Sequence, residues 1–348
     1  MYQLSLLSVL LQTILLASTN FIAATETIRR PISEEQWSRR RRQQQEEQDN
    51  SIIGGTEAQP GEFPFFVRFS GNILCGGTLI SPNRVLTAAH CIYEVGVPEA
   101  VFVASSNKDN GQYIPVTCAV VHPKYQTPFV TVLNDVAILK LSKDAVLADG
   151  TTATASDSNS TTAAEIVQLN SDSNFPGNVQ DPDLTVIGFG KLSNGGSISE
   201  TLQKVGTNYV PTETCQQSYS DVIVRPVFHI CGDVMNKGDC QGDSGGPLLV
   251  QSTDTPGQYI QIGIVSFGYG GCAAPEYPDI YTKVSSYYDF IQSHIDDDSC
   301  PADTSTLGES NGLGGNIAGV ATMAVDYLGL LLTVTKDRIV DFVFFWRN

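Results

Sequence analysis

The chain has 348 residues, of which 41% are hydrophobic and 16% charged, enough for one two-lobed domain with a substantial core and for extensions beyond it. Its 37 acidic residues outnumber its 20 basic residues, and the net charge is −17 at pH 7. Nucleic acids and anionic membranes attract basic surfaces, so this charge argues against both as partners and favours a soluble extracellular protein.

Residues 1–24 have the outline of a secretory signal peptide. An apolar run at 4–16 is too short to span a bilayer, and small residues follow it. The segment lacks a basic start, so the sequence does not define the cleavage point. The alternative is a membrane anchor or a buried N-terminal helix. The secretory route suits the eight cysteines, which we expect to form four disulfides. We therefore expect a secreted, extracellular protein.

Residues 25–51 are interpreted as a propeptide. They are charged, rich in glutamine and almost free of apolar residues, which is typical of disorder. Four consecutive arginines, Arg39 to Arg42, indicate a processing site for a protease. The alternative is a solvated charge run.

The composition changes at Ile52, where the chain reads IIGG, and short β-rich runs continue to about Val284. Glycine, proline, asparagine or serine separates most of the runs, which predicts an all-β sandwich or barrels. The predicted strands are residues 65–69, 78–80, 85–89, 101–104, 116–121, 136–141, 185–190, 263–267 and 279–283.

Between the predicted strands at 136–141 and 185–190 lies a polar stretch typical of an interdomain connection. It contains the sequon of Asn159, a predicted glycosylation site. Residues 285–295 are predicted to be a helix, because Tyr287, Ile291 and Ile295 follow one another at helical spacing.

Residues 299–348 form a C-terminal tail of unknown role. The run 316–335 is about long enough to span a membrane, but Asp326 lies in its middle, at a cost of roughly 2.5 to 3.5 kcal/mol. A dispensable appendage or a processing segment is therefore favoured over membrane anchorage.

Residues 238–247 read GDCQGDSGGP, with Ser244 among glycines. Glycines let backbone N–H groups converge on one point, because no Cβ obstructs the approach. A serine hydroxyl there would lie beside a pair of N–H donors suited to an oxyanion. The alternative is a glycine-rich surface turn.

A nucleophilic serine needs a base and a carboxylate that orients the base. Of the four histidines, His122 precedes a proline, His229 is expected in a loop near a cysteine, and His294 lies in the predicted C-terminal helix. Only His90 combines the end of a predicted strand, small neighbours and an adjacent cysteine. Asp135 lies in the apolar run DVAIL, where a buried carboxylate requires a donor such as the His90 ring N–H.

The motifs TAAHC at His90, DVAIL at Asp135 and GDSGGP at Ser244, in this order, resemble the chymotrypsin/trypsin family of serine proteases. IIGG at Ile52 resembles the mature amino terminus of that family. The resemblance extends from Ile52 to about Ile295. It implies an all-β domain at 52–298, with two antiparallel six-stranded β-barrels, the active site in the cleft between them, and a C-terminal α-helix.

The resemblance also implies roles for single residues. His90 is the general base and later the general acid, Asp135 fixes its tautomer, and Ser244 is the nucleophile. The N–H groups of Gly242 and Ser244 hold the oxyanion. The predicted substrate-binding segment, residues 266–268, pairs with substrate backbone through Ser266, Phe267 and Gly268.

Three disulfides follow from the same resemblance. Cys75–Cys91 would close the histidine loop, Cys215–Cys231 a loop of the second barrel, and Cys240–Cys272 the walls of the specificity pocket. Cys118 and Cys300 remain and are paired with each other for that reason. That bond would attach the C-terminal helix to the first barrel.

The specificity pocket departs from the family pattern. Trypsin-like members have an aspartate six residues before the nucleophile, where this chain has Gly238, and Asp239 follows it. Asp279, however, occupies a pocket-wall position where the family usually has glycine. We expect an acidic, tolerant pocket that accepts Arg or Lys as well as apolar side chains. The alternative is that local hydrogen bonds hold Asp279 and the side chain narrows the pocket.

Activation departs from the pattern as well. In the family, cleavage before the Ile52-like residue frees an α-ammonium, which here would pair with Asp243. The residue before Ile52 is Ser51, so a trypsin-like activator would not cut there. Cleavage after Arg42 would leave nine residues, 43–51, ahead of Ile52. Either a second protease trims them or most molecules stay latent.

The sequence thus predicts a secreted serine endopeptidase made as a zymogen, with protein or peptide substrates and an activating protease as partners. A non-catalytic homologue that binds a partner is the alternative, and a non-peptide esterase is a weaker one. No cofactor and no metal site are predicted. The segment 104–111 contains Asn107 and Asp109, but too few carboxylates for a calcium loop. We expect a monomer.

Overall fold

The computed structural model describes residues 55–300, apart from gaps at 72–73, 95, 109, 127–130, 149–162, 180, 194–195, 234–237, 239, 256, 270–271, 273 and 275. The predictions for the signal peptide, the propeptide, Ile52, Asp109, Asn159, Asp239 and the tail beyond Cys300 therefore lie outside the described residues.

Six antiparallel strands close the first barrel in the order β2-β3-β4-β7-β6-β5. Burial alternates at the start of β6, where Gln112 and Ile114 are buried and Tyr113 and Pro115 are exposed, as expected for a strand with one face on a core. The strands are β2 (Phe66–Phe69), β3 (Gly76–Ser81), β4 (Arg84–Thr87), β5 (Ala100–Val103), β6 (Gln112–Val121) and β7 (Ala137–Leu141).

The second barrel is a ring of six antiparallel strands in the order β9-β10-β11-β14-β13-β12, closed by the pairing of β12 with β9. Short β1 (Thr56–Glu57) extends it at β10, and β8 (Gln168–Leu169) pairs with β13 in parallel. The ring consists of β9 (Asp183–Gly188), β10 (Gln203–Val210), β11 (His229–Asp233), β12 (Pro247–Gln251), β13 (Tyr259–Phe267) and β14 (Asp279–Lys283). The predicted all-β fold with two six-stranded barrels is confirmed.

A single apolar cluster holds the two barrels together. It fills the first barrel and continues through Ile187 and Phe189 to Leu249 and Ile264 of the second. A separate cluster around Leu184, Leu248 and Tyr281 fills the second barrel. Continuous burial across the junction fixes the relative position of elements that contribute to the site.

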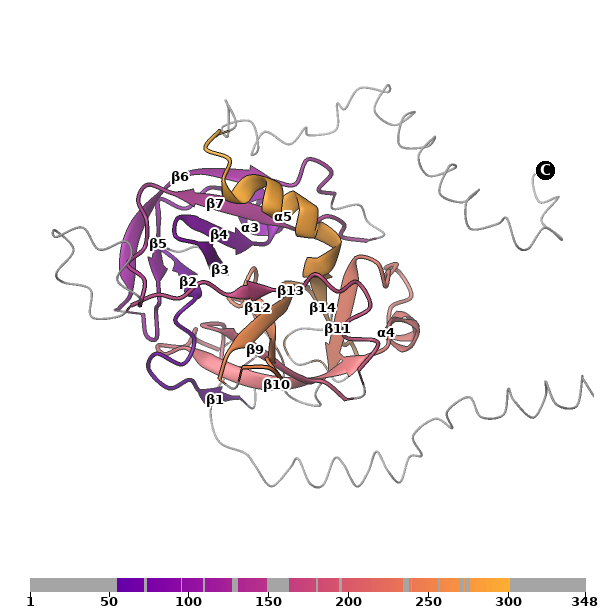
Figure 1. The fold of residues 1–348 in the computed structure, drawn as a ribbon. Helices are drawn as coiled ribbons and strands as arrows, with labels where there is room; N and C mark the ends of the chain where they lie inside the picture. Colours follow the sequence, from indigo (N-terminus) through magenta and orange to yellow (C-terminus); the bar gives the residue numbers. More distant parts are fainter. Residues whose placement is uncertain are drawn as a thin grey trace, which may run out of the picture.

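The described residues form few helices. They are α3 (Ala89–Tyr93), α4 (Thr212–Ser218), the 3-10 turn η2 (Val284–Tyr287) and α5 (Tyr288–Ile295). The predicted C-terminal helix is therefore present, with a 3-10 first turn, and Figure 1 shows α5 over the first barrel. Within the described residues, no helix has both the length and the hydrophobicity to cross a membrane.

The guanidinium of Arg84 attaches the end of α5 to the first barrel. Its Nε donates to the carbonyl oxygen of His294 at 3.1 Å, and its Nη2 to that of Asp297 at 2.8 Å. Lys140 Nζ donates to the Asp298 carbonyl oxygen at 2.6 Å. The bond to His294 satisfies a carbonyl group that the end of α5 leaves unpaired, and the other two hold the chain that follows the helix.

One predicted strand ends early. The run 85–89 forms β4 only as far as Thr87, and Ala89 begins α3. Thr87 pairs with Ala137, the first residue of β7, so the ladder has no partner residue beyond it. The chain therefore turns into a helix at the position of His90.

All eight cysteines are in disulfides, and the pairs are Cys75–Cys91, Cys118–Cys300, Cys215–Cys231 and Cys240–Cys272. Cys118 lies on β6, and Cys300 follows α5. This bond joins the C-terminal end of the described chain to the first barrel.

Candidate active site

Asp135 follows a turn of the backbone at Asn134, just before β7. Asn134 has a φ of 58°, a left-handed conformation that asparagine tolerates better than most residues. Its N–H donates to the Tyr287 hydroxyl oxygen at 3.1 Å. The side chain of Asp135 that follows is only 1% exposed.

Three donors meet the buried Asp135 carboxylate. His90 Nδ1 donates to Oδ2 over 2.9 Å, and the His90 backbone N–H to Oδ1 over 2.9 Å. The Ser266 hydroxyl donates to Oδ2 over 2.5 Å. Because Nδ1 carries the proton, Nε2 of a neutral His90 has a lone pair available as a base. The carboxylate thus sets both the tautomer and the position of the ring.

The pKa values of this pair are shifted in opposite directions. Burial lowers the pKa of His90, but the charge of Asp135 and the hydrogen bond to it outweigh burial, so the His90 pKa is raised. Burial raises the pKa of Asp135, but the charge of His90 and the three hydrogen bonds outweigh it, so the Asp135 pKa is lowered. Asp135 therefore remains ionised at neutral pH.

The turn that carries Ser244 packs against the strand that precedes His90. The Gly76 N–H donates to the Ser244 carbonyl oxygen at 2.8 Å, and the Gly245 N–H to the Val265 carbonyl oxygen at 3.0 Å. Gly245 has a φ of +77°, and a Cβ there would lie 2.3 Å from Thr87 Oγ1 and 3.2 Å from the Ala88 nitrogen. Glycine is required by both conformation and space. This contact brings the Ser244 turn to within two residues of His90 along the chain.

The predicted oxyanion donors belong to the same turn. Among the hydrogen bonds between described residues, none uses the N–H of Gly242 or that of Ser244. Gly242 has a φ of +112°, and a Cβ at this position would lie 2.9 Å from the Gly190 Cα. Within the described part of the chain, neither N–H group therefore has a hydrogen-bond acceptor.

Asp243, next to Ser244, is 1% exposed. Its Oδ1 accepts the N–H of Gly190 at 2.7 Å, and its Oδ2 that of Cys240 at 2.9 Å. Burial raises the pKa of Asp243 to about 6, against the lowering effect of these two bonds. In the described part of the chain, no cationic side chain pairs with this carboxyl group.

The predicted substrate-binding segment, residues 266–268, lies at the C-terminal end of β13. Ser266 is buried, Phe267 half-buried and Gly268 exposed. Asp279, at the start of β14, is 9% exposed, and its Oδ1 lies 3.3 Å from the position a Cβ on Gly268 would take. The carboxyl group thus faces the end of β13. Gly238 is buried, and Asp239 lies outside the described residues.

Two residues have contacts that the sequence did not indicate. Ser266 was predicted only as part of the substrate-binding segment, yet its hydroxyl bonds Asp135 across 131 residues of chain. The available signal was a serine inside an apolar run. His229, predicted in a loop, is the first residue of β11 and is 4% exposed. Its neighbour Ile230 and the adjacent cysteine were the signs of a buried strand.

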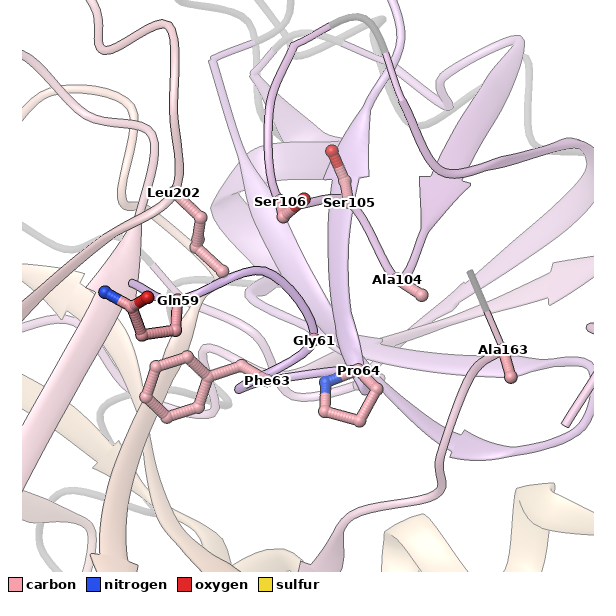
Figure 2. A pocket seen from close by; sticks show the side chains of 9 residues that line it. All are labelled: Gln59, Gly61, Phe63, Pro64, Ala104, Ser105, Ser106, Ala163 and Leu202. Atoms are coloured by element: carbon pink, nitrogen blue, oxygen red, sulfur yellow. The ribbon is translucent and has the colours of Figure 1, made fainter. Parts of the chain in front are cut away.

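Across the residues that the structure describes, neither a group of possible metal ligands nor the pocket in Figure 2 suggests a different site. Among the described residues, Cys75, His90 and Cys91 bring potential metal ligands together, but the two sulfur atoms are bonded to each other. A shallow pocket lies where the start of the domain passes the first barrel, and none of the predicted site residues lines it (Figure 2). Its lining residues are Gln59, Gly61, Phe63, Pro64, Ala104, Ser105, Ser106, Ala163 and Leu202.

Comparison with known proteins agrees with this geometry. A family model described as Trypsin matches residues 52–291, more than half of the chain. The chain belongs to the trypsin family. Trypsin-family membership makes it a serine endopeptidase, with proteins or peptides as substrates.

Several relatives match over most of their length. The chain is 34% identical to Trypsin-1 of Astacus astacus over 260 residues, which cover 70% of this chain and 99% of that protein. It is 34% identical to a trypsin of Saccharopolyspora erythraea, covering 70% of this chain and 98% of that protein. It is also 33% identical to a vitellin-degrading protease of Bombyx mori, with 70% and 85% covered.

Proposed function

We propose that this trypsin-family protein hydrolyses peptide bonds through His90, Asp135 and Ser244. His90 Nε2 takes the proton of the Ser244 hydroxyl as Oγ bonds to the substrate carbonyl carbon. The protonated His90 then gives that proton to the leaving amine as the peptide C–N bond breaks, which leaves an acyl-enzyme. Water releases the acid by the same two proton transfers and regenerates Ser244.

The observation that carries this proposal is the buried Asp135–His90 pair. A carboxylate that is 1% exposed and accepts three hydrogen bonds has a fixed direction, and it directs Nδ1–H inward and Nε2 outward. The charge that develops on His90 during reaction is stabilised by this carboxylate. A histidine that served only for packing would not need hydrogen bonds from both its backbone N–H and its Nδ1 to the same carboxylate.

The N–H groups of Gly242 and Ser244 would bind the oxyanion of the tetrahedral intermediate. Each such donor contributes about 2.7 to 4 kcal/mol in related sites. Support comes from the N–H groups of Gly242 and Ser244, which donate to no other described residue and lie on the turn of the proposed nucleophile.

We propose that Asp279 supplies the negative charge of the specificity pocket in place of Gly238. The carboxyl group faces Gly268 at the end of the predicted substrate-binding segment. With no acidic side chain at Gly238, the pocket floor would accept apolar side chains as well as Arg or Lys.

Cleavage profiles with fluorogenic peptides test this assignment. Asp279→Gly and the isosteric Asp279→Asn should lose most of their activity on Arg and Lys substrates and keep activity on Phe and Leu substrates. Asp254→Asn, which removes an exposed carboxylate, serves as the control. An unchanged Arg/Lys preference in both Asp279 variants would remove Asp279 from the pocket and favour a structural role.

We further propose a secreted, monomeric zymogen with a signal peptide at 1–24, a propeptide at 25–51, the protease domain at 52–298 and the tail at 299–348. Asp243 is buried without a cationic partner among the described residues, which suits an α-ammonium of Ile52 freed by an activating protease. The sequon of Asn159 and the four disulfides suit the secretory route.

A fluorophosphonate probe tests the catalytic assignment. Secreted protein is treated to remove the propeptide, its new N-terminus is sequenced, and labelling is measured. We expect a chain that begins at Ile52 to be labelled at Ser244. Ser244→Ala should not be labelled, and Ser220→Ala, a change at an exposed serine, should be labelled as well as wild type. Absence of labelling on a chain that begins at Ile52 would favour the non-catalytic binding protein.

A further inference from the structure

His229 is a buried histidine whose two ring nitrogens both bond to backbone groups. The Arg225 N–H donates to Nδ1 at 3.0 Å, and Nε2 lies 2.8 Å from the Val132 carbonyl oxygen. Nδ1 must accept and Nε2 must donate, so only the neutral tautomer with the proton on Nε2 satisfies both contacts.

The carbonyl group of Val132 belongs to the segment that leads into Asp135. Residues of the second half of the chain hold this segment at three points. Thr131 Oγ1 donates to the Ile223 carbonyl oxygen at 2.7 Å, the Asn134 N–H donates to the Tyr287 hydroxyl, and Val132 accepts from His229. Of the three side chains involved, only the imidazole changes its charge between pH 5 and 8.

The other contact of the His229 ring is with the substrate-binding segment. Its ring packs edge-on against Phe267, with centroids 5.9 Å apart and an interplanar angle of 85°. Phe267 directly follows Ser266, whose hydroxyl bonds Asp135. One imidazole therefore contacts both the backbone that presents Asp135 and the aromatic ring next to Ser266.

We propose that His229 is a positioning residue that holds the Asp135 segment of the first barrel and the Phe267 segment of the second barrel in one fixed arrangement. It does so by donating from Nε2 to the Val132 carbonyl and by packing against the Phe267 ring. Its effect on catalysis rests on the proposed function, whereas its effect on the order of residues 131–136 does not.

Acid should disturb this arrangement. Protonation would place Nδ1–H of His229 against the Arg225 N–H, so the bond that orients the ring from Arg225 would be lost, while Nε2 would keep its proton for the Val132 carbonyl. The charged groups that face the ring are Asp135, from the first barrel, and Arg225, from the turn before β11. The neighbouring positions on β13 and β14 are Phe267 and Thr282, which carry no charge.

The direction of the His229 pKa agrees with this geometry. Burial lowers the pKa, the bond to Val132 and the charge of Asp135 raise it in part, and the charge of Arg225 lowers it further, so the net shift is downward. The neutral ring is thus the form present at neutral pH.

Two variants separate the contacts. His229→Phe keeps a ring against Phe267 but removes the donor and the acceptor. His229→Gln has a carboxamide N–H that reaches toward the Val132 carbonyl and has no titrating group. His294→Gln, at the half-exposed end of α5, is the matched control, because it changes a histidine away from this site.

The kinetic readout compares an extended peptide substrate with a single-residue ester. For His229→Phe we expect a rise in KM for the extended peptide of about tenfold, equal to the loss of one hydrogen bond of ordinary strength, and a smaller change for the ester. His229→Gln should have a KM close to that of the wild type at neutral pH. Unlike the wild type, it should show no rise in KM at acid pH. His294→Gln should match the wild type.

Amide hydrogen exchange of residues 131–136 and 265–268 gives a readout that does not depend on activity. It is measured in Ser244→Ala protein with and without His229→Phe, after circular dichroism has shown that both are folded. We expect faster exchange in the double variant. Equal exchange together with unchanged KM would overturn the proposal. If the wild type proves inactive, the proposed function fails, and exchange alone decides the positioning role.

Discussion

The N–H of Gly190 donates to Oδ1 of Asp243 at 2.7 Å, and the missing side chain of Gly190 provides the space in which that carboxyl group lies. A Cβ built on Gly190 would lie 2.2 Å from Oδ2, and a Cβ built on Gly188 would lie 2.0 Å from Oδ1. Both glycines therefore leave the space that the carboxyl group of Asp243 occupies, one residue from the proposed nucleophile Ser244.

Gly190→Ala should displace the Asp243 carboxyl group, because the two cannot occupy the same space. The Ser244 turn would shift with it, and misplacement of about 1 Å costs on the order of 100-fold in rate. Fluorophosphonate labelling rate and kcat/KM measure the loss. Gly206→Ala is the control, since the nearest atom to a Cβ there is 3.9 Å away. Normal activity in Gly190→Ala would mean that Asp243 need not lie where it does.

The raised pKa of Asp243 predicts how the stability of the unprocessed chain depends on pH. The pKa of Asp243 is about 6 in the folded chain, and its ordinary value is 3.8. Between pH 3.8 and 6, the folded chain therefore keeps a proton that the unfolded chain has released. Stability should fall as the pH rises through this window and level off above it. At pH 7 the cost is on the order of 3 kcal/mol.

Asp243→Asn in the full-length chain should remove this pH dependence and raise the Tm at pH 7. A chain that begins at Ile52 should instead be stabilised by the native Asp243, because the α-ammonium would compensate its charge. Calorimetry from pH 4 to 8 on both lengths measures this, with Asp254→Asn as an exposed control. The same Tm difference in both lengths would argue against pairing of Ile52 with Asp243.

Asp135→Asn should lower kcat by about 10⁴-fold, the size of effect expected when the orienting carboxylate of a triad is neutralised. The charge that raises the His90 pKa would be lost, while the burial that lowers it would remain. The acid limb of kcat/KM should therefore move to lower pH. A pH–rate profile from pH 4 to 10 checks the shift, and an unmoved limb would show that another group controls it.

Arg84→Met should destabilise the fold without changing catalysis. Arg84 is 2% exposed and donates to the carbonyl oxygens of His294 and Asp297, so its loss leaves these groups unpaired at a cost of roughly 2 to 4 kcal/mol. Lys140→Met removes a more exposed cation that also bonds Asp298 and should cost less than about 1 kcal/mol.

Urea unfolding gives the free energy of unfolding for both variants. The value of kcat/KM, measured without urea where both variants are fully folded, reports on the active site. A loss of kcat in folded Arg84→Met would show that the attachment of α5 affects the active site as well.

Local patterns predicted the first barrel better than the second. The predicted runs overlap every strand of the first barrel, because its strands are rich in β-branched and aliphatic residues. In the second barrel, β10, β11 and β12 were not predicted. Gly206 lies inside β10 and Gly232 inside β11, where glycine breaks the apolar pattern of the sequence. Strand β12 directly follows the glycines of the Ser244 turn. Pairing with distant strands, rather than local propensity, makes these segments β-strands.

The site shows the same division. Short motifs predict His90, Asp135 and Ser244 as catalytic residues, because each motif is contiguous in sequence. The groups that hold them come from far along the chain: Gly190 is 53 residues from Asp243, and Ser266 is 131 residues from Asp135. No periodicity or spacing connects residues so far apart, so these contacts are visible only in the folded chain.

The bond between Cys118 and Cys300 has a consequence for proteolysis. It is the only one of the four disulfides that joins the first barrel to the chain beyond the second, since the other three close loops within one barrel. A cut in the polar connection at 149–162 would produce two polypeptides that stay covalently linked as one particle. The intact and the nicked forms would migrate together until a reductant separates them.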